Sequence, residues 1–357
     1  MARLGDYVRI RTGKLDANAS SENGQYPFFT CAVEPLKIDT YSYDCECVLV
    51  AGNGDLNVKY YNGKFDAYQR TYIIESLDKT VLSVPYLYCF LDKYVETLRQ
   101  QAIGGVIKYI KLGNLTEAAI PIPSVVEQNE IVIKLNKANE LIALRKEQLA
   151  KLDQLVKSRF IELFESGNYP VCRLRDVCSK ITDGTHKTPN YLDAGVTFIS
   201  AKNIVNGELD FSDVKYISDQ EYAEIQKRCQ TEMGDILLSK SGSLGAPVIV
   251  KTTERIGLFE SLSVIKYDRS KLLPAFLCEQ LKSDRIQRQF KVGTKGVAIK
   301  HLHLGVIADT DIVVPPIEDQ NAFAAFVEQT DKSKLAIKKS LEELETLKKS
   351  LMQKYFG

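Results

Sequence analysis

Two long stretches of the chain carry apolar residues at alternating steps of three and four. In residues 127–164 these positions are Ile131, Leu135, Ala138, Ile142, Leu149, Leu152, Val156 and Leu163. In residues 319–356 they are Phe323, Val327, Ile337, Leu341, Leu344, Leu351 and Tyr355. This spacing predicts two helices with coiled-coil seams, each about 57 Å long. Because a lone helix would expose its seam, we expect the two to pack antiparallel.

Four basic residues interrupt the predicted seams: Arg145, Arg159, Lys334 and Lys348. They are either devices that fix the register of the helices or edge positions whose charged ends reach solvent. The sequence leaves both interpretations open.

Elsewhere the pattern is mostly that of short strands. Apolar runs bounded by Gly, Asn and Asp occupy residues 26–30, 47–50, 195–199 and 235–238, which is typical of strands between turns. Residues 85–101 and 274–290 each begin with Pro and predict one helix in each half of the chain. Each half therefore predicts an α+β unit of about 120 to 150 residues, the usual size of a domain.

The chain also repeats itself. The predicted long helices both follow a proline-rich entry and both start with a Gln-Asn pair, Gln128-Asn129 and Gln320-Asn321. Further matches in the same order join Arg3-Leu4 to Arg173-Leu174, and join Gly104, Ile107 and Lys108 to Gly296, Ile299 and Lys300. Two copies indicate a duplication, not a solenoid. We predict a pseudo-two-fold internal repeat with four parts: domains 1–122 and 167–315, and helical segments 123–166 and 316–357.

Composition limits the choice of function. The 357 residues carry a net charge of +1, which argues against a chain that coats DNA unaided. The eight cysteines form no CxxC pair and only three histidines are present, so we expect reduced thiols in the cytoplasm and no metal site. The sequence shows neither a signal-peptide pattern nor an apolar run of membrane-spanning length, and no membrane association is expected.

Motifs for catalysis are missing from the sequence. There is no phosphate-binding glycine loop, no HExxH and no G-x-S-x-G, and no Asn-Pro-Pro-aromatic or Asp-Pro-Pro-aromatic methyltransferase motif. His186, His301 and His303 all lie in the second half, which fits poorly with a duplicated catalytic site. A recognition and assembly subunit is favoured over an enzyme. A different class remains open, a coiled-coil scaffold or repressor that binds protein partners.

Several segments carry a resemblance to a known family. They are the two Gln-Asn helix starts, the helix end at residues 347–356, and residues 181–189, 198–204 and 234–242. With these the chain resembles the specificity (S) subunits of type I restriction–modification systems. In the first half Thr12-Gly13-Lys14 stands where the second half has Asp183-Gly184-Thr185-His186, so the first domain is a more diverged copy.

The resemblance implies a function and partners. Two target-recognition domains would each read one half of a split sequence in double-stranded DNA. The two helices would set the gap and dock two methyltransferase (M) subunits, which bring S-adenosylmethionine, and restriction/motor (R) subunits would join for cleavage. The chain itself would hold no cofactor and carry out no catalysis.

Candidate DNA contacts are polar loop residues. Lys and Arg bond guanine or phosphate, Asn bonds adenine, and Ser and Thr hydroxyls contact either base. In the first domain the candidates are Lys14, Asn53, Asn57, Lys59, Lys64, Arg70 and Lys108. In the second they are Thr185, His186, Lys187, Lys202, Asn203, Lys240, Ser241, Ser243, Lys295 and Lys300. For each residue the alternative is a solvated side chain. Lys108 and Lys300 match across the repeat, so they are phosphate-binding or structural residues in preference to readers of sequence.

Overall fold

The computed structural model describes residues 1–165, 167, 169–293 and 301–357. The chain forms two compact units. The first comprises Met1–Glu147 and Lys338–Gly357, and the second comprises Gln148–Ile337. Each unit combines a sheet-rich part with segments of two long helices, so the α+β class is confirmed.

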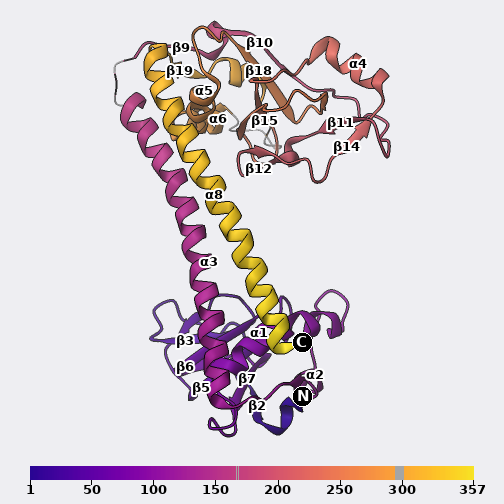
Figure 1. Ribbon diagram of the computed structural model, residues 1–357, viewed down its shortest axis with the longest axis vertical. Helices are drawn as coiled ribbons and strands as arrows, with labels where there is room; N and C mark the ends of the chain where they lie inside the picture. The colour runs from indigo at the N-terminus through magenta and orange to yellow at the C-terminus, as the bar shows by residue number, and fades with distance from the viewer. Residues whose placement is uncertain (166, 168, 294–300) are drawn as a thin grey trace. The chain divides into compact units, whose positions relative to one another are not determined.

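The two long helices are α3 (Val125–Phe160), which continues as a π-helical turn over Ile161–Glu165, and α8 (Ile317–Phe356) (Figure 1). In the first unit Ile131 and Leu135 share a buried cluster with Met352 and Phe356. In the second unit Val156 and Phe160 share one with Phe323. Of the apolar positions predicted from the spacing of three and four, Ile131, Leu135, Ala138, Val156 and Phe323 are buried and the others are partly buried.

Ion pairs flank these apolar contacts. In the first unit Lys146 Nζ lies 3.2 Å from Glu345 Oε1. In the second unit Lys334, one of the residues that interrupt the seam, lies 2.6 Å from Asp153 Oδ1. Within each unit, residue numbers that rise along α3 are matched by residue numbers that fall along α8. The helix segments within that unit therefore run in opposite directions.

The first unit is built on a six-stranded sheet. Its order is β2 (Val8–Thr12), β7 (Thr71–Ser76), β5 (Tyr43–Ala51), β6 (Val58–Ala67), β3 (Tyr26–Phe29) and β4 (Leu36–Ile38). Neighbours are antiparallel except β3 and β6, which are parallel. Beside the sheet lie β1 (Ala2–Arg3) paired with β8 (Ala119–Ile120), the 3-10 turn η1 (Leu4–Asp6), α1 (Val84–Gln101) and α2 (Leu112–Thr116).

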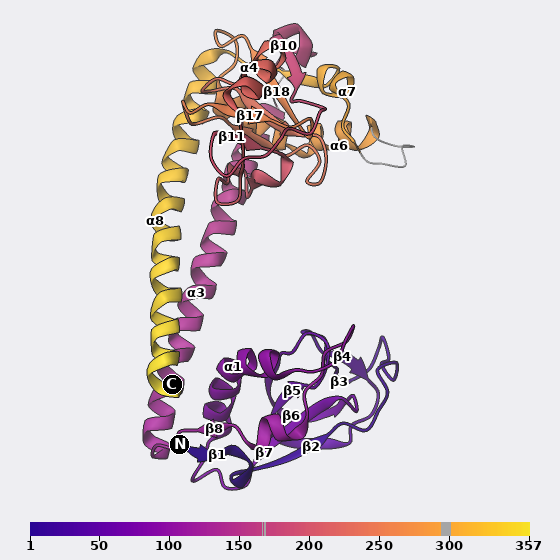
Figure 2. The same cartoon turned by 90° about the vertical axis from the view of Figure 1, so that its right-hand side faces the viewer.

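Alternation along β5 gives this sheet two apolar faces. Val48 and Val50 belong to the main core with α1, whereas Cys47 and Leu49 belong to a smaller core on the other face. Figure 2 shows α1 beside β5 and β6. The helix predicted at residues 85–101 is therefore confirmed, and it covers the main core.

The second unit has two principal sheets. The first has the order β10 (Cys178–Asp183), β18 (Leu262–Tyr267), β15 (Ile236–Ser239) and β16 (Pro247–Ile249), and Figure 1 labels the first three of these strands. The second has the order β14 (Lys215–Ile217), β11 (Val196–Ile199) and β17 (Ile256–Leu258). Two small pairs join β9 (Val171–Arg173) to β19 (Asp311–Val313) and β12 (Ile204–Val205) to β13 (Glu208–Leu209). The helices are α4 (Asp219–Arg228), α5 (Pro274–Lys282), α6 (Asp284–Gly293) and α7 (Leu304–Ala308), with 3-10 turns η3 (Leu174–Val177) and η4 (Ala201–Asn203).

The two units share one strand order. The series β2, β7, β5, β6 of the first unit recurs as β10, β18, β15, β16 in the second. In the first unit the long β6 also pairs in parallel with β3. In the second unit a separate strand, β17, pairs in parallel with β11. Helix α4 and the β12–β13 hairpin are extra elements of the second unit. The sequences therefore diverge through insertions around a common sheet.

One predicted helix is divided in two. Residues 274–290 form α5 and α6, and the break lies at Ser283, whose φ of −62° and ψ of 148° are extended. The buried Ser283 hydroxyl accepts a hydrogen bond from the Ile286 N–H (3.5 Å), and Gln287 Nε2 donates to the Leu281 carbonyl (2.7 Å). Serine that bonds the main chain in this way competes with continuous helix, which apolar periodicity does not reveal.

The glutamine of each Gln-Asn helix start is fully buried. Gln128 accepts a hydrogen bond from the Ser83 N–H (2.9 Å) and donates to the carbonyls of Val81 (2.7 Å) and Pro123 (2.9 Å). Gln320 has the same three kinds of partner: the Leu273 N–H (2.9 Å) and the carbonyls of Lys271 (2.8 Å) and Pro315 (2.9 Å). Each glutamine thus joins the start of a long helix to the loop before α1 or α5.

We expect Gln320→Leu to lower the free energy of unfolding by about 3 kcal/mol, because it leaves buried main-chain groups without partners at a cost of about 1–3 kcal/mol each. Urea denaturation followed by circular dichroism measures the change. The matched control is Asn321→Ala at the exposed neighbouring position, with an expected change within about 0.5 kcal/mol. Equal stability of the two variants would show that the glutamine contacts are dispensable.

Candidate nucleic-acid interface

In both units the same edge of the sheet gathers the predicted contact loops. In the second unit β10 and β15 end there and β18 begins, since Asp183 pairs with Ser263 and Ser239 pairs with Leu262. In the first unit β2 and β5 end and β7 begins at the corresponding edge. We call this the loop edge. It comprises residues 13–15, 52–57 and 68–70 in the first unit, and 184–189, 240–245 and 259–261 in the second.

A glycine opens the loop edge in each unit because the chain passes close to another strand. A Cβ at Gly13 would lie 2.1 Å from the Ala67 carbonyl oxygen, and one at Gly184 would lie 2.1 Å from that of Leu258. The next residues then bond the same carbonyls: Lys14 N–H to Ala67 (3.1 Å) and Thr185 N–H to Leu258 (2.9 Å). The geometry supports the pairing of Thr12-Gly13-Lys14 with Asp183-Gly184-Thr185.

In the second unit a buried carboxylate organises the loop edge. The side chain of Asp183 is 4% exposed and forms ion pairs with Lys240, which is 3% exposed, and with Arg228 of α4. His186 Nε2 lies 3.3 Å from Asp183 Oδ2, and its Nδ1 lies 2.9 Å from Glu260 Oε2. Burial raises the pKa of Asp183, but the hydrogen bond and charge of Lys240 and the charge of Arg228 outweigh it and hold that pKa below its ordinary value. Asp183 is therefore ionised at neutral pH.

Two predicted DNA contacts need correction. Lys240 is buried against Asp183, so its ammonium group is not presented to a ligand. Asn203 is 3% exposed, and its amide accepts from the Ser200 N–H (3.0 Å) and donates to the carbonyls of Asp210 (3.1 Å) and Asp213 (2.9 Å). Both residues hold loops in place. Polar type alone does not distinguish such residues from exposed ones.

The remaining described candidates of the second unit stay exposed or half-buried. The Thr185 hydroxyl accepts from the Lys187 N–H (3.2 Å), which leaves the side chains of His186 and Lys187 exposed beside it. Ser241 is half-buried and Ser243 is exposed, on either side of Gly242, whose φ is +70°. These five lie together on the loop edge.

The other second-unit candidates differ in position. Lys202 is exposed and pairs with Asp213 (2.9 Å). Its neighbour Ala201 donates to Ser261 Oγ (3.0 Å), which places Lys202 near the loop edge. Lys295 and Lys300 lie outside the described residues.

A cleft of about 400 Å³ lies between the loop after β10 and helix α4. Its walls include Asp183, His186 and Lys187 on one side and Gln220, Glu224 and Arg228 on the other. Sequence reasoning missed Arg228, because a basic residue at the end of a helix carries no signal of its own. Its place beside Asp183 follows only from the fold.

In the first unit three candidates surround Cys31. The Cys31 thiol donates to Asn53 Oδ1 (2.8 Å), and Asn57 Nδ2 donates to the Cys31 carbonyl (2.8 Å). Lys59 donates to Asn57 Oδ1, and burial lowers the pKa of Lys59, although the neighbouring Cys31 and Glu34 oppose this shift. Both asparagines are half-buried. Both ends of the Asn57 amide bond neighbouring groups, whereas Asn53 uses its Oδ1.

The main chain brings two more first-unit candidates to the same place. The Arg70 carbonyl accepts from the Gly52 N–H (2.7 Å), and the Lys108 carbonyl accepts from the Gly54 N–H (2.9 Å). Both side chains are exposed, as is that of Lys14 at the end of β2. The first-unit loop edge therefore gathers Lys14, Asn53 and Arg70, and Lys108 is bonded beside it.

Lys64 does not join this group. It faces Asp44 across the β5–β6 pair, at the opposite end of β5 from the loop edge. Its ammonium group lies 4.6 Å from the centre of the Tyr41 ring, a cation–π contact.

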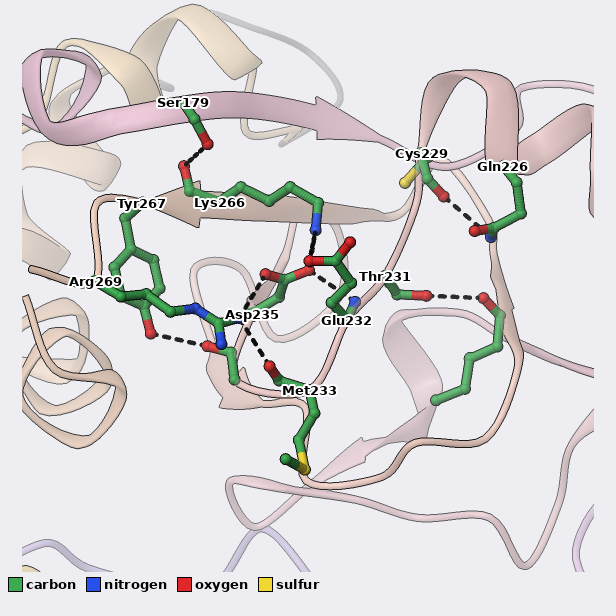
Figure 3. A network of polar contacts seen from close by, with 12 residues as sticks. Ser179, Gln226, Cys229, Thr231, Glu232, Met233, Asp235, Lys266, Tyr267 and Arg269 are labelled. Atoms are coloured by element: carbon green, nitrogen blue, oxygen red, sulfur yellow. Dashed lines mark hydrogen bonds and ion pairs between the residues drawn. The ribbon is translucent and has the colours of Figure 1, made fainter.

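A second polar network lies at the other end of β15 (Figure 3). There Asp235, just before the strand, binds Lys266 Nζ (2.7 Å) and Arg269 (3.5 Å) and accepts from the Glu232 N–H (2.8 Å). Tyr267 donates to the Gly234 carbonyl (2.8 Å). Lys266 and Arg269 hold the turn before β15, at the end of the strand opposite the loop edge. They are therefore structural and not part of the loop edge.

The described residues lack the features of two other kinds of site. Within them no helix is long and apolar enough to cross a membrane, and no group of three or more His, Cys, Asp or Glu side chains is placed to hold a metal ion. All eight cysteines lie in the described part of the chain and are free of disulfides.

Comparison with known proteins defines the family. Residues 1–154 and 167–348 match the type I restriction modification DNA specificity domain. Since both matches together span most of the chain, the protein belongs to this family. Each half of the chain carries one of the matches.

Two curated relatives illustrate the likeness. The EcoDI specificity subunit of Escherichia coli is 39% identical over 154 residues, which cover 43% of this chain and 34% of that protein. The MjaVIII specificity subunit of Methanocaldococcus jannaschii is 20% identical over 385 residues, which cover 99% of this chain and 90% of that protein. The first likeness is local and the second spans nearly the whole chain.

Solved structures share the fold. The type I restriction–modification S subunit from M. genitalium has a TM-score of 0.62 at 17% identity, covering 100% of this chain and 95% of that one. A chain from a structure on complex assembly and conformational transition of the type I R-M system has a TM-score of 0.59 at 16% identity, covering 99% and 96%.

Proposed function

We propose that this chain is the DNA sequence-recognition subunit of a type I restriction–modification complex and that each unit reads one half of a bipartite duplex target. The observation that carries the proposal is one main-chain frame with different side chains. In the first unit the Gly52 N–H donates to the Arg70 carbonyl, and the Gly52 carbonyl accepts from the Ile110 N–H. In the second unit the Lys240 N–H donates to the Ser261 carbonyl, and the Lys240 carbonyl accepts from the Leu302 N–H. Equivalent positions on the loop edge thus carry unlike residues, as expected for two readers with different targets.

The chemistry of the candidate residues that are exposed or half-buried suits duplex DNA. In the first unit the Asn53 and Asn57 amides match adenine edges and Arg70 matches guanine, while Lys14 and Lys108 match phosphates. In the second unit Thr185, His186, Ser241 and Ser243 offer base contacts, with Lys187 and Lys202 for phosphates. The buried Lys240 and Asn203 position these loops.

The long helices supply the rest of the proposed function. We assign α3 and α8 as an antiparallel coiled coil that relates the two domains by a pseudo-two-fold axis and docks two methyltransferase subunits and the restriction subunits. S-adenosylmethionine would bind the methyltransferase partners, and this chain would contribute no catalytic group. Partners that add positive charge would also account for DNA binding by a complex whose recognition chain has a net charge of only +1. A scaffold or repressor role is not favoured, because both halves match a DNA specificity family.

The test is to express the chain with its cognate methyltransferase subunit and to sequence the methylated adenines of the host genome. We expect the two proteins to co-purify and the methylated sites to share one split motif with an unspecified gap. A contiguous motif, or no methylation by a co-purifying pair, contradicts the proposal.

A further inference from the structure

Residues 103–109 of the first unit form a short loop with a fixed base. Ile103 and Tyr109 exchange both main-chain hydrogen bonds (3.0 and 2.8 Å), and the Lys108 carbonyl accepts from Gly54 (2.9 Å). Gly104 has a φ of +121°, and a Cβ there would lie 2.5 Å from the Ile107 carbonyl oxygen. The turn therefore requires glycine, and its base is attached to the loop edge.

The tip of this loop is apolar and exposed. The Val106 side chain is fully exposed and Ile107 is 62% exposed, with Ile103 and Tyr109 partly exposed beside them. Scattered apolar residues on a surface are ordinary, but a contiguous exposed group marks an interaction site. The turn at Gly104 holds this tip in solvent.

The surroundings of the tip favour a nucleic acid as the occupant. Lys108 adjoins it, and the hydrogen bonds of Gly52 and Gly54 bring Arg70 to the same edge. The acidic Asp55 nearby pairs with Arg99 (3.4 Å), which offsets its repulsion of phosphate. An apolar tip flanked by cations is the arrangement with which proteins insert a wedge between base pairs.

The sequence repeats part of this loop, with Ala298 at the position of Val106, whereas the reading residues differ between the two halves. Gly104, Ile107 and Lys108 recur in order as Gly296, Ile299 and Lys300, although the second copy lies outside the described residues. In contrast Gly52 and Arg70 correspond to Lys240 and Ser261. An element common to both copies serves a step common to both half-sites and not the choice of sequence.

We propose that the tip residues Val106 and Ile107 insert into the base stack of the first half-site and act as a wedge that opens the duplex. The proposal rests on the proposed function, in which each half-site presents an adenine for methylation. A methyltransferase acts on a base that has left the stack, so a wedge would lower the cost of that step. The residues that read sequence remain separate from it.

The experiment uses the complex of the full chain with its methyltransferase subunits, and duplexes that carry 2-aminopurine in turn at each position of both half-sites. We expect wild type to raise the fluorescence at one step of the first half-site. Ile107→Ser and the double variant V106S/I107S should lose this rise in the first half-site alone and weaken duplex binding about tenfold, while the methylated motif stays unchanged. Ile107→Leu should retain the rise. The control is Leu77→Ser, which is 58% exposed and follows β7 at the end away from the loop edge.

Three outcomes overturn the wedge. The first is a full fluorescence rise with Ile107→Ser or with V106S/I107S. The second is a variant that no longer co-elutes with the methyltransferase, which would make the tip a protein contact. The third is a wild-type complex that methylates a split motif without any fluorescence change in the first half-site. If wild type yields no split motif, the proposed function fails and the wedge fails with it. A melting temperature equal to that of wild type shows that a variant still folds.

Discussion

Lys240→Met should lower the free energy of unfolding by about 3 kcal/mol, because removing one partner of a buried ion pair strands the other charge. Asp183 would keep Arg228 and His186, but both of these side chains are half exposed, whereas Lys240 is buried with it. Urea denaturation followed by circular dichroism measures the loss, since the chain has no tryptophan to report by fluorescence. The matched control is Lys202→Met, which breaks an exposed pair with Asp213 and should cost less than about 1 kcal/mol.

The pH dependence separates the ion pair from simple packing. The folded-state pKa of Asp183 is depressed, so its stabilisation is present above the unfolded-state value of about 3.9 and is lost as the pH falls through the folded-state pKa. Wild type should exceed Lys240→Met in stability by the full amount at pH 7, and the difference should shrink below about pH 4. A difference that stayed constant into strong acid would assign the effect to packing.

The sequence predicts those parts of the fold that depend on local periodicity. The two long helices follow from steps of three and four, because a seam leaves that pattern wherever it is buried. The Gln-Asn helix starts were recognised as signatures, and the structure supplies the reason: Gln128 and Gln320 each satisfy three main-chain groups. Strand order was not predictable, since pairing of β2 with β7, or of β10 with β18, depends on contacts far apart in the sequence.

The sequence indicates which segments are loops, but it does not indicate which of their polar side chains are buried. Asn53 and Thr185 lie in loops, as polar residues next to glycines indicate. Burial of Lys240 could not be read from the sequence, because its partner Asp183 is distant in the chain and lies on another strand. The break at Ser283 was hidden for a similar reason, since its hydroxyl acts within the main chain where apolar spacing gives no signal.

Exchange of the first domain should replace one half of the methylated motif and leave the other half unchanged. If residues 1–122 are taken from a relative with a different target, the loop edge that carries Asn53 and Arg70 changes while the second unit is intact. The junction is favourable, because Gln128 bonds the main chain of Val81 and Ser83 and so does not depend on the side chains there.

The donor domain must still fit the end of α8. Phe356 lies 5.3 Å from the Tyr86 ring and 5.9 Å from the Phe90 ring, measured between centroids, so a donor with aromatic residues at these two positions is required. The chimaera, expressed with the cognate methyltransferase, should methylate a motif that joins the donor's first half to the present second half. The control is the reciprocal exchange of residues 167–315, which should change only the other half. If either exchange altered both halves, recognition would be shared between the units, because independent loop edges cannot transmit a change of sequence preference to one another.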